Sequence, residues 1–599
     1  WMNLADGESP SFVKNLSFFA SYQMGFMYWR YFMWNFAGRQ NDIQGQGSKN
    51  EGNWLTGIKS LDGLRLEKQS KLPPSITENE GYNRFYGLPL ILGLAGLLFL
   101  YRRNRNDMMV IGTLFFFTGL AIILYLNQDP LQVRERDYAY VGSFYAFAIF
   151  IGFGVLALKE CLARYSTPKL SLAIASVISL TAVPALMGYQ GWDDHDRSGK
   201  TTALEWASNY LNSCAQNAIL FTNADNDTFP LWYAQEVEGI RTDVRVVNIQ
   251  YLSDDAYINQ MKLSLGKSAP LPIKMLPDKY VKGVREYIPF IDYGFTDSVE
   301  LKDLMAVLTS DNKEDKLPMS DGSYDNFLPT KNLKITIDAD QVIRTGTVSE
   351  KDRSKITSKM EWQFQENAVY KAKLAIFDIL ANNNWERPIY FGSTISEDTY
   401  VGLDKYLYLE GYAHRLLPLK TDTEDKRDKT QITNSDVMYT NVMSKFDFKG
   451  FNNAKYLDLE SRRIARGTLI MNSTLASNLI MEGKPEKASS ILIRSIKELP
   501  LKNYSIDDTI SKLQTIECLY LTKNIGAANQ LVKETTNFLD QELSYIASLN
   551  PNRYTIYSGD IQRGLFVLEK MYRITGLHNQ PELSQLLKDK IEQLQGPFI

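Results

Sequence analysis

A short loop between two apolar runs carries the densest group of charged residues beside membrane-like sequence. In it Arg134 and Arg136 alternate with Glu135 and Asp137, and Tyr138 opens the apolar run that follows. A guanidinium group offers a planar set of N–H donors that matches phosphate oxygens. At headgroup depth the two arginines would bind a lipid phosphate, with the carboxylates and the tyrosine supporting the loop. The alternative is that arginines and carboxylates pair with one another and only close the loop.

Two acidic clusters form a second candidate site, for a metal. Asp225 and Asp227 stand in Asn-Ala-Asp-Asn-Asp-Thr after a predicted strand, and Asp193 and Asp194 stand in Gly-Trp-Asp-Asp-His-Asp. Closely spaced carboxylates are able to ligate a divalent cation such as Ca²⁺. A complete twelve-residue calcium loop is absent, and an aspartate in this setting also serves as a helix cap. Metal binding and helix capping therefore remain open.

Other classes of site have no support in the sequence. The patterns GxGxxG, GxxxxGK[ST], GxSxG and HExxH are absent, so nothing indicates a dinucleotide enzyme, an ATPase, a serine hydrolase or a zinc protease. The three cysteines and three histidines are scattered, so we expect neither a zinc site nor a disulfide framework. A net charge of −3 provides no basic field for nucleic acid.

The charged loop lies within a membrane-like region. Four apolar runs, each close to the length of about 20 residues that crosses a bilayer, predict transmembrane helices over Phe85–Tyr101, Met108–Leu126, Val141–Leu158 and Leu170–Tyr189. Basic residues gather in the first and last of the connecting loops, which the positive-inside rule places in the cytoplasm. The charged loop and everything after the last span then lie on the outer face, which in a bacterium is the periplasm.

The aromatic stretch 12–36 precedes these spans and is interrupted by polar residues. A charged Arg30 in mid-span would cost at least a few kcal/mol. Because Trp and Tyr favour the headgroup level, we expect interfacial helices here, with a fifth span as the alternative. The chain begins at Trp1 without a signal peptide, and we expect that an N-terminal part of the natural protein is missing.

The sequence predicts five regions. They are a periplasmic loop with interfacial aromatic helices over 1–84, four transmembrane helices over 85–190, a periplasmic α/β domain over 191–420, a linker over 421–455, and helical hairpins over 456–599. The α/β assignment depends on short β-branched runs alternating with helical patterns. The hairpins are similar to tetratricopeptide repeats, although the spacing is irregular. They would either bind peptide or act as a structural cap.

Several long motifs carry a family resemblance that runs from about Ser11 to Lys420 and, more loosely, to the end. Among them are LYLNQDPLQVRERDYAYVGSFYAFAIFIGFGVLAL, GWDDHDRSGK, FTNADNDTFPLWYAQEVEGIRTDVRVVNIQYL and PIYFGSTISEDTYVGLDKYLYLEGYAHRLLPLK. Together they resemble a family of large membrane proteins of Bacteroidota, formerly of unknown function and related to the animal transmembrane protein O-mannosyltransferase.

The resemblance implies a polytopic GT-C type glycosyltransferase in the bacterial inner membrane. Such an enzyme moves a sugar, expected to be mannose, from a polyprenyl-phosphate carrier to Ser or Thr of exported proteins. Its partners are the lipid-linked sugar, the acceptor proteins and membrane lipids, and no other cofactor is certain. The essential carboxylate of this class lies in the first outer loop, so we expect it outside this chain. Under this resemblance the acidic clusters, Asp193 with Asp194 and Asp225 with Asp227, would bind the acceptor or a metal.

Two rival functions remain at this point. One is a non-catalytic scaffold that holds exported proteins at the secretion machinery, with the membrane part as an anchor. The other is a lipid or sugar transporter, which predicts ionisable residues inside the spans, and the four runs contain essentially none.

Overall fold

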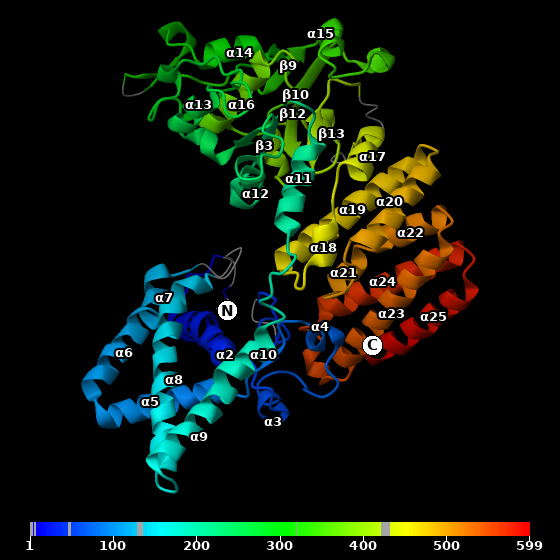
Figure 1. The fold of residues 1–599 in the computed structure, drawn as a ribbon. Helices are drawn as coiled ribbons and strands as arrows, with labels where there is room; N and C mark the ends of the chain where they lie inside the picture. The colour runs from blue at the N-terminus through cyan, green and yellow to red at the C-terminus, as the bar shows by residue number, and fades with distance from the viewer. Residues whose placement is uncertain are drawn as a thin grey trace.

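The computed structural model describes residue 4 and residues 7–45, 49–128, 136–319, 322–420 and 432–598. Figure 1 shows three parts: a helical bundle coloured blue to cyan, an α/β part coloured green, and a stack of helices coloured yellow to red. The blue segment that follows the first helix extends from the bundle to the red helices. A segment near the N-terminus therefore lies beside the C-terminal helices.

The bundle contains the predicted apolar runs as helices. Its helices are α5 (Leu88–Arg103), α6 (Arg105–Phe117), α7 (Leu120–Leu126), α8 (Val141–Leu162), α9 (Pro168–Leu180) and α10 (Leu186–Gly191). Among the described residues, three helical stretches are long and apolar enough to cross a membrane: Arg105–Leu126, Asp137–Leu162 and Pro168–Gly191. The first predicted run forms α5, which has only 16 residues. These features fit a membrane protein, and four spans remain a prediction.

Small residues let α5 and α8 approach closely. A Cβ atom added at Gly96 would lie 1.8 Å from the carbonyl oxygen of Phe150, and one at Gly154 would lie 2.2 Å from that of Leu92. Such small-residue crossings are typical of helices that pack in lipid, where close backbone contact replaces the hydrophobic effect. Either glycine would therefore resist any substitution.

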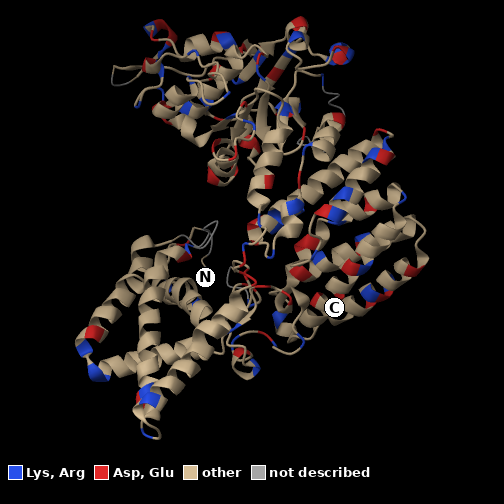
Figure 2. Ribbon diagram, viewed as in Figure 1, with Lys and Arg blue, Asp and Glu red and all other residues tan. Residues whose placement is uncertain are grey.

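The basic loops lie at one end of the bundle. Arg102 and Arg103 end α5, and Lys159 lies in the last turn of α8. Figure 2 shows Lys and Arg gathered at this end, where α5 meets α6 and α8 meets α9, far from the α/β part. This arrangement agrees with the distribution of basic residues on which the predicted orientation depends, and the orientation itself stays a prediction.

The aromatic stretch forms one continuous helix that packs into the bundle. It comprises α1 (Phe12–Phe18), a π-helical segment (Phe19–Trp29) and α2 (Arg30–Phe36). The Phe32 ring contacts those of Phe115 and Phe147 edge-on. Arg30 is buried, but its guanidinium donates to the carbonyl oxygens of Gly52 at 2.5 Å and Phe26 at 3.1 Å. Backbone oxygens thus offset the cost of this charge, and both an interfacial helix and a fifth span remain predictions.

The α/β part is built on a five-stranded sheet of order β13-β14-β12-β3-β4. Its strands are β3 (Ile219–Thr222), β4 (Arg245–Asn248), β12 (Ile389–Gly392), β13 (Leu407–Leu409) and β14 (Ala413–Leu416). β12, β3 and β4 are parallel, and β14 is antiparallel to both of its neighbours. The strands β3, β4 and β12 form from short apolar runs rich in β-branched and aromatic residues, the pattern on which the α/β prediction depends.

Helices cover this sheet on both faces. α11 (Thr202–Ser213) and α12 (Ala224–Glu236) share a core with Leu220 of β3, whereas α16 (Lys371–Asn382) packs on the face of Phe221. β3 leads through α12 to β4 on one side, and the chain later enters β12 on the other side of β3. The carboxyl ends of β3 and β12 therefore form a topological switch point, where open α/β sheets bind their ligands.

Shorter elements between β4 and α16 in the chain complete the α/β part. They are α13 (Asp255–Met261), β5 (Tyr287–Pro289), β6 (Val299–Glu300), α14 (Leu301–Leu308), β7 (Leu317–Pro318), β8 (Tyr324–Asp325), β9 (Asn332–Thr336), α15 (Ala339–Arg344), β10 (Lys359–Gln363) and β11 (Ala368–Tyr370). β10, β9 and β6 form a second, three-stranded sheet.

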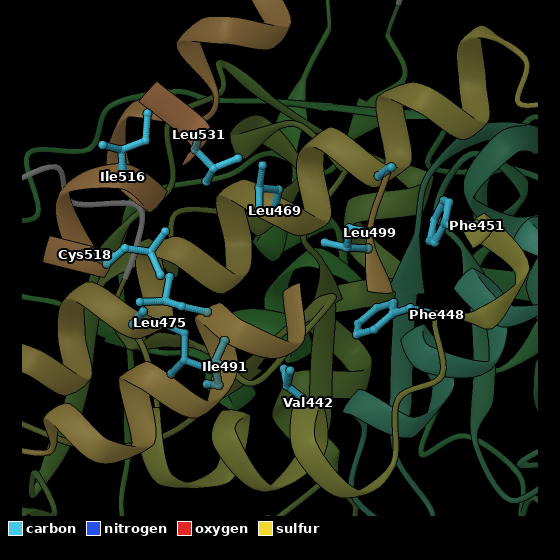
Figure 3. Packing of buried hydrophobic residues seen from close by; sticks show 14 of the residues in the cluster. Val442, Phe448, Phe451, Leu469, Leu475, Ile491, Leu499, Ile516, Cys518 and Leu531 are labelled. Atoms are coloured by element: carbon cyan, nitrogen blue, oxygen red, sulfur yellow. The ribbon is translucent and has the colours of Figure 1, made fainter. Parts of the chain in front are cut away.

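The C-terminal helices lie in antiparallel pairs. They follow α17 (Ser435–Ser444) and α18 (Lys449–Asn453) and are α19 (Leu459–Met481), α20 (Pro485–Glu498), α21 (Ile506–Ile510), α22 (Leu513–Leu521), α23 (Ile525–Ala547), α24 (Ser558–Leu577) and α25 (Pro581–Gln595). Three pairs turn on a residue with positive φ, namely Gly483, Lys523 and Asn579. Figure 3 shows the core between them, with Leu475 of α19, Ile491 of α20 and Cys518 of α22. Their likeness to tetratricopeptide repeats remains a prediction.

The segment before the spans joins the bundle to these helices. It contains β1 (Gly38–Arg39), α3 (Lys59–Asp62), α4 (Pro74–Thr77) and β2 (Asn83–Arg84). Asp42 in this segment accepts two hydrogen bonds from Arg462 of α19, at 2.9 and 3.2 Å, and one from the Tyr456 hydroxyl at 2.5 Å. These contacts connect residues 414 and 420 positions apart, so the segment before the spans packs against the start of the C-terminal helices.

Candidate functional site

The charged loop is described only in part. Arg134 and Glu135 lie outside the described residues, whereas Arg136 and Tyr138 are exposed. The Tyr31 hydroxyl of α2 donates a 2.5 Å hydrogen bond to the Asp137 carboxylate. The loop is thereby tied to the aromatic helix at the end of the bundle opposite the basic loops. Phosphate binding by the two arginines remains a proposal.

The first acidic cluster joins two parts of the chain. Asp194 is buried and accepts hydrogen bonds from Arg39 of β1 at 3.2 Å and from Asn83 of β2 at 3.1 Å. His195 Nδ1 lies 2.6 Å from the other carboxylate oxygen of Asp194. The Asp193 carboxylate accepts a hydrogen bond from the backbone N–H of Asp194, and partial burial raises the pKa of the Asp193 carboxyl. These contacts hold the antiparallel β1–β2 pair before the spans against the segment after them.

The second acidic cluster lines a groove of about 1020 Å³ at the switch point. Three walls enclose this switch-point groove. The first is α12 with the residue before it, the second is the segment 393–400 after β12 with part of β14, and the third is one face of α19. The lining residues that carry the argument below are Trp206, Asp225, Asp227, Phe229, Thr394, Glu397, Tyr400, His414, Asp458, Glu460, Arg463, Ile464, Gly467, Met471 and Thr474.

Asp227 lies in the first turn of α12, and Asn223 holds the N-cap position. The Asp227 carboxylate is buried and accepts a hydrogen bond from the Thr394 hydroxyl, which follows β12. Burial raises the pKa of the Asp227 carboxyl, whereas hydrogen bonds from Thr394 and from the backbone of Asn223 lower it. Asp227 is therefore not the N-cap residue, but its carboxylate interacts with the backbone at the start of α12 as well as with a hydroxyl from the segment after β12.

His414 of β14 is the residue of the groove that the sequence argument missed. Its side chain is 7% exposed, and no hydrogen bond of its imidazole is found within the described part of the chain. Its ring lies edge-on to that of Tyr400, with the centroids 5.9 Å apart. Burial lowers the pKa of the imidazole to about 4, so near neutral pH it is uncharged and able both to donate and to accept. A ligand with both kinds of polar group would satisfy it.

Thr394 and Tyr400 were also outside the sequence prediction. The motif PIYFGST was visible, but its position at a binding edge depends on the pairing of β12 with β3, in which Phe391 lies opposite Phe221. The rule that ligands bind at the carboxyl ends of parallel strands would have selected Thr394 once that pairing was known.

The acidic side chains do not form a metal site among the described residues. Within that part of the chain, no group of three or more His, Cys, Asp or Glu side chains is placed to hold a metal ion. We therefore consider Asp227 as a hydrogen-bonding carboxylate, with Thr394 as its partner.

Comparison with known proteins links the α/β part to one family model. The model described as TMEM260-associated domain 2 matches residues 203–437, less than half of the chain. No curated protein and no solved structure matches. The matched region contains both strands of the switch point and His414, whereas the α19 wall of the groove lies beyond it.

Proposed function

We propose that this chain is part of a membrane glycosyltransferase that moves a sugar from a polyprenyl-phosphate carrier to Ser or Thr of exported proteins. The observation that supports the proposal is the match to TMEM260-associated domain 2, which occurs in one chain with three helices able to cross a membrane. The match agrees with the resemblance to the animal transmembrane protein O-mannosyltransferase. On this basis the sugar is mannose and the site of transfer is the periplasmic face of the bacterial inner membrane.

In this proposal the chain contributes binding and positioning. Arg134 and Arg136 stabilise the carrier phosphate as it departs and gains charge, because fixed cations act most strongly where charge develops. Asp137 positions that loop through its hydrogen bond to Tyr31. The carboxylate that assists the attacking hydroxyl is expected elsewhere in the full-length protein.

The test uses membranes that contain the full-length protein. Undecaprenyl-phosphate mannose and a fluorescent Ser/Thr peptide are supplied, and mannosylated peptide is measured by mass spectrometry. The double change Arg134→Ala, Arg136→Ala should lower the rate about 10²-fold or more while protein level and melting temperature stay unchanged. Replacing Arg136 by Lys should give a rate between those of the wild type and of Arg136→Ala, since Lys keeps the charge but loses the bidentate geometry.

Two outcomes would count against this assignment. Normal transfer by a stable double variant would remove the phosphate role of the arginines. A lower melting temperature without a specific rate defect would indicate that they pair with the loop carboxylates instead. A matching control is Arg164→Ala, at the opposite end of the bundle, which should leave the rate unchanged.

A non-catalytic scaffold is the second candidate function. The switch-point groove favours it to the extent that the groove is able to hold a chain segment without any chemistry. Binding of exported proteins without sugar transfer, in the presence of every donor tested, would support the scaffold.

A further inference from the structure

The switch-point groove is long rather than round along its α19 wall. Glu460, Ile464, Gly467, Met471 and Thr474 of this helix line the groove. Their spacing of three and four residues places them on one face of the helix. At a rise of 1.5 Å per residue, this stripe extends for about 20 Å. A span of about 20 Å matches roughly six residues of extended polypeptide and exceeds what one sugar ring requires.

The charges that line the groove are predominantly negative. Five carboxylates face two cations, Lys200 and Arg463. Both cations already have acidic partners in the groove wall, because Lys200 pairs with Asp458 and Arg463 lies 2.8 Å from Glu460. The remaining carboxylates, those of Asp225, Asp227 and Glu397, have no ion pair within the described part of the chain. The groove therefore attracts a ligand with positive charge.

The inner end of the groove offers hydrogen bonds in both directions. The buried imidazole of His414 is open to a donor or an acceptor, and the Asp227 carboxylate next to Thr394 accepts. Peptide groups carry one donor and one acceptor per residue, and Ser or Thr hydroxyls carry both. Phe229 and Tyr400 add apolar ring surface that is able to cover aliphatic stems of Lys or Arg. Shape, charge and hydrogen-bonding capacity thus agree on one class of ligand.

We infer that the switch-point groove binds an extended, positively charged polypeptide segment between α12, the segment after β12, and α19. That the segment belongs to the acceptor protein depends on the proposed function, whereas the binding itself does not. The α/β part and α19 then form one binding site for polypeptide, which lies on the predicted outer side of the bundle.

A steric variant tests the groove directly. Gly467 lies on the α19 stripe, and a Cβ atom added there would meet nothing within 4 Å, so the side chain of Gly467→Trp starts in open space and extends into the groove. Gly526 of α23 is likewise helical, exposed and open, but lies outside the groove, so Gly526→Trp is a matched control. The probe is the fluorescein-labelled peptide (Lys-Thr-Ser)₄, and binding to the purified full-length protein in detergent is measured by fluorescence anisotropy.

The expected result is binding of the peptide by the wild type and by Gly526→Trp, with binding by Gly467→Trp reduced at least tenfold. The neutral peptide (Gln-Thr-Ser)₄ should bind about tenfold more weakly than the lysine peptide, and added salt should narrow the difference. Equal binding by Gly467→Trp and the wild type would overturn the inference. Displacement of the peptide by a neutral manno-oligosaccharide would overturn it in favour of a glycan site.

A charge variant separates attraction by the groove from attraction by the whole surface. Asp225→Asn with Glu397→Gln removes two exposed carboxylates from the groove, and Asp303→Asn with Glu314→Gln removes two exposed carboxylates elsewhere on the α/β part. Only the first pair should weaken binding of the lysine peptide. An equal effect of both pairs would contradict a defined site.

Failure of the inference is distinguishable from failure of the proposed function. Peptide binding that depends on Gly467, in a protein that transfers no sugar, leaves the groove assignment intact and removes the transferase. Sugar transfer with an unchanged KM for the acceptor in Gly467→Trp keeps the transferase and removes the groove as its acceptor site.

Discussion

Glu542 of α23 predicts a pH-dependent contact between the C-terminal helices and the segment before the spans. Its carboxylate is 8% exposed and accepts hydrogen bonds from the Ser75 backbone N–H at 3.1 Å and the Ser75 hydroxyl at 2.9 Å. Burial raises the pKa of this carboxyl from 4.5 to about 7. Ser75 lies in α4, so protonation of one side chain is coupled to the docking of that segment.

The magnitude follows from the shift in pKa. A rise in pKa from 4.5 to about 7, at about 1.4 kcal/mol per pKa unit, corresponds to about 3.5 kcal/mol. Because the pKa is raised on folding, the folded protein binds the proton more tightly than the unfolded chain. The contribution is fully present below about pH 4.5 and is lost as the pH rises through about 7. The contact between α4 and α23 should therefore weaken between pH 5 and pH 8.

Hydrogen exchange at the Ser75 amide measures this coupling, since that N–H is itself a donor to Glu542. After correction for the intrinsic pH dependence of exchange, protection should fall by about 10²-fold between pH 5 and pH 8 in the wild type. Glu542→Gln, which cannot ionise, should keep nearly constant protection across this range. Glu569→Gln, an exposed glutamate of the neighbouring α24, should behave like the wild type.

A pH-independent protection of Ser75 in the wild type would refute the reasoning. So would an unchanged pH dependence in Glu542→Gln, because another group would then have to carry the titration. The first result would mean that the Glu542 carboxylate is solvated in the folded protein, and the second that Glu542 is not the group that titrates.

Two further predictions concern the connection between the parts and the orientation of the bundle. Asp42→Ala should destabilise the protein by about 2–3 kcal/mol, because it removes the carboxylate 2.9 Å from the buried Arg462 guanidinium and leaves Glu80, at 3.6 Å, as the remaining ion-pair partner. Thermal unfolding of the purified protein should show a lower transition than in the exposed control Asp303→Ala. A transition equal to that of the control would show that the pair adds nothing to stability. Cys161 is exposed whereas Cys214 and Cys518 are buried, so an impermeant thiol reagent should label nothing in intact cells and label Cys161 after permeabilisation. Labelling of Cys161 in intact cells would reverse the orientation.

Local patterns in the sequence were sufficient to predict most of the helices and strands named above. The runs around Val141–Leu158 and Leu170–Tyr189 form apolar helices because hydropathy over about 20 residues reflects the solvent that surrounds a helix. The strands over Ile219–Thr222 and Arg245–Asn248 follow from short β-branched runs. Hydropathy alone was less reliable for the run Phe85–Tyr101, because its helix Leu88–Arg103 has 16 residues and is shorter than the length of about 20 that crosses a bilayer.

Residue type and local sequence were a weaker guide to the role of each site residue. The acidic pairs looked alike in the sequence, but Asp194 binds Arg39 and Asn83 as a structural contact, whereas Asp227 faces a groove. The difference lies in the neighbours that folding supplies, and neither set of neighbours is close in sequence. The roles of Arg134 and Arg136 remain a proposal for the same reason. Arg134 lies outside the described residues, and phosphate binding by Arg136 depends on the neighbouring groups of the loop.

The sequence by itself determined the apolar helices, the α/β alternation and the paired C-terminal helices, because each depends on periodicity or hydropathy within a single segment. Only the tertiary structure decided that Thr394 meets Asp227 across 167 residues, that His414 is buried without a hydrogen-bonding partner in the described part, and that Asp42 holds Arg462. These contacts depend on the order in which strands pair and on how distant segments pack. No local pattern encodes that order, because the free energy that selects it arises from burial and pairing summed over the whole fold.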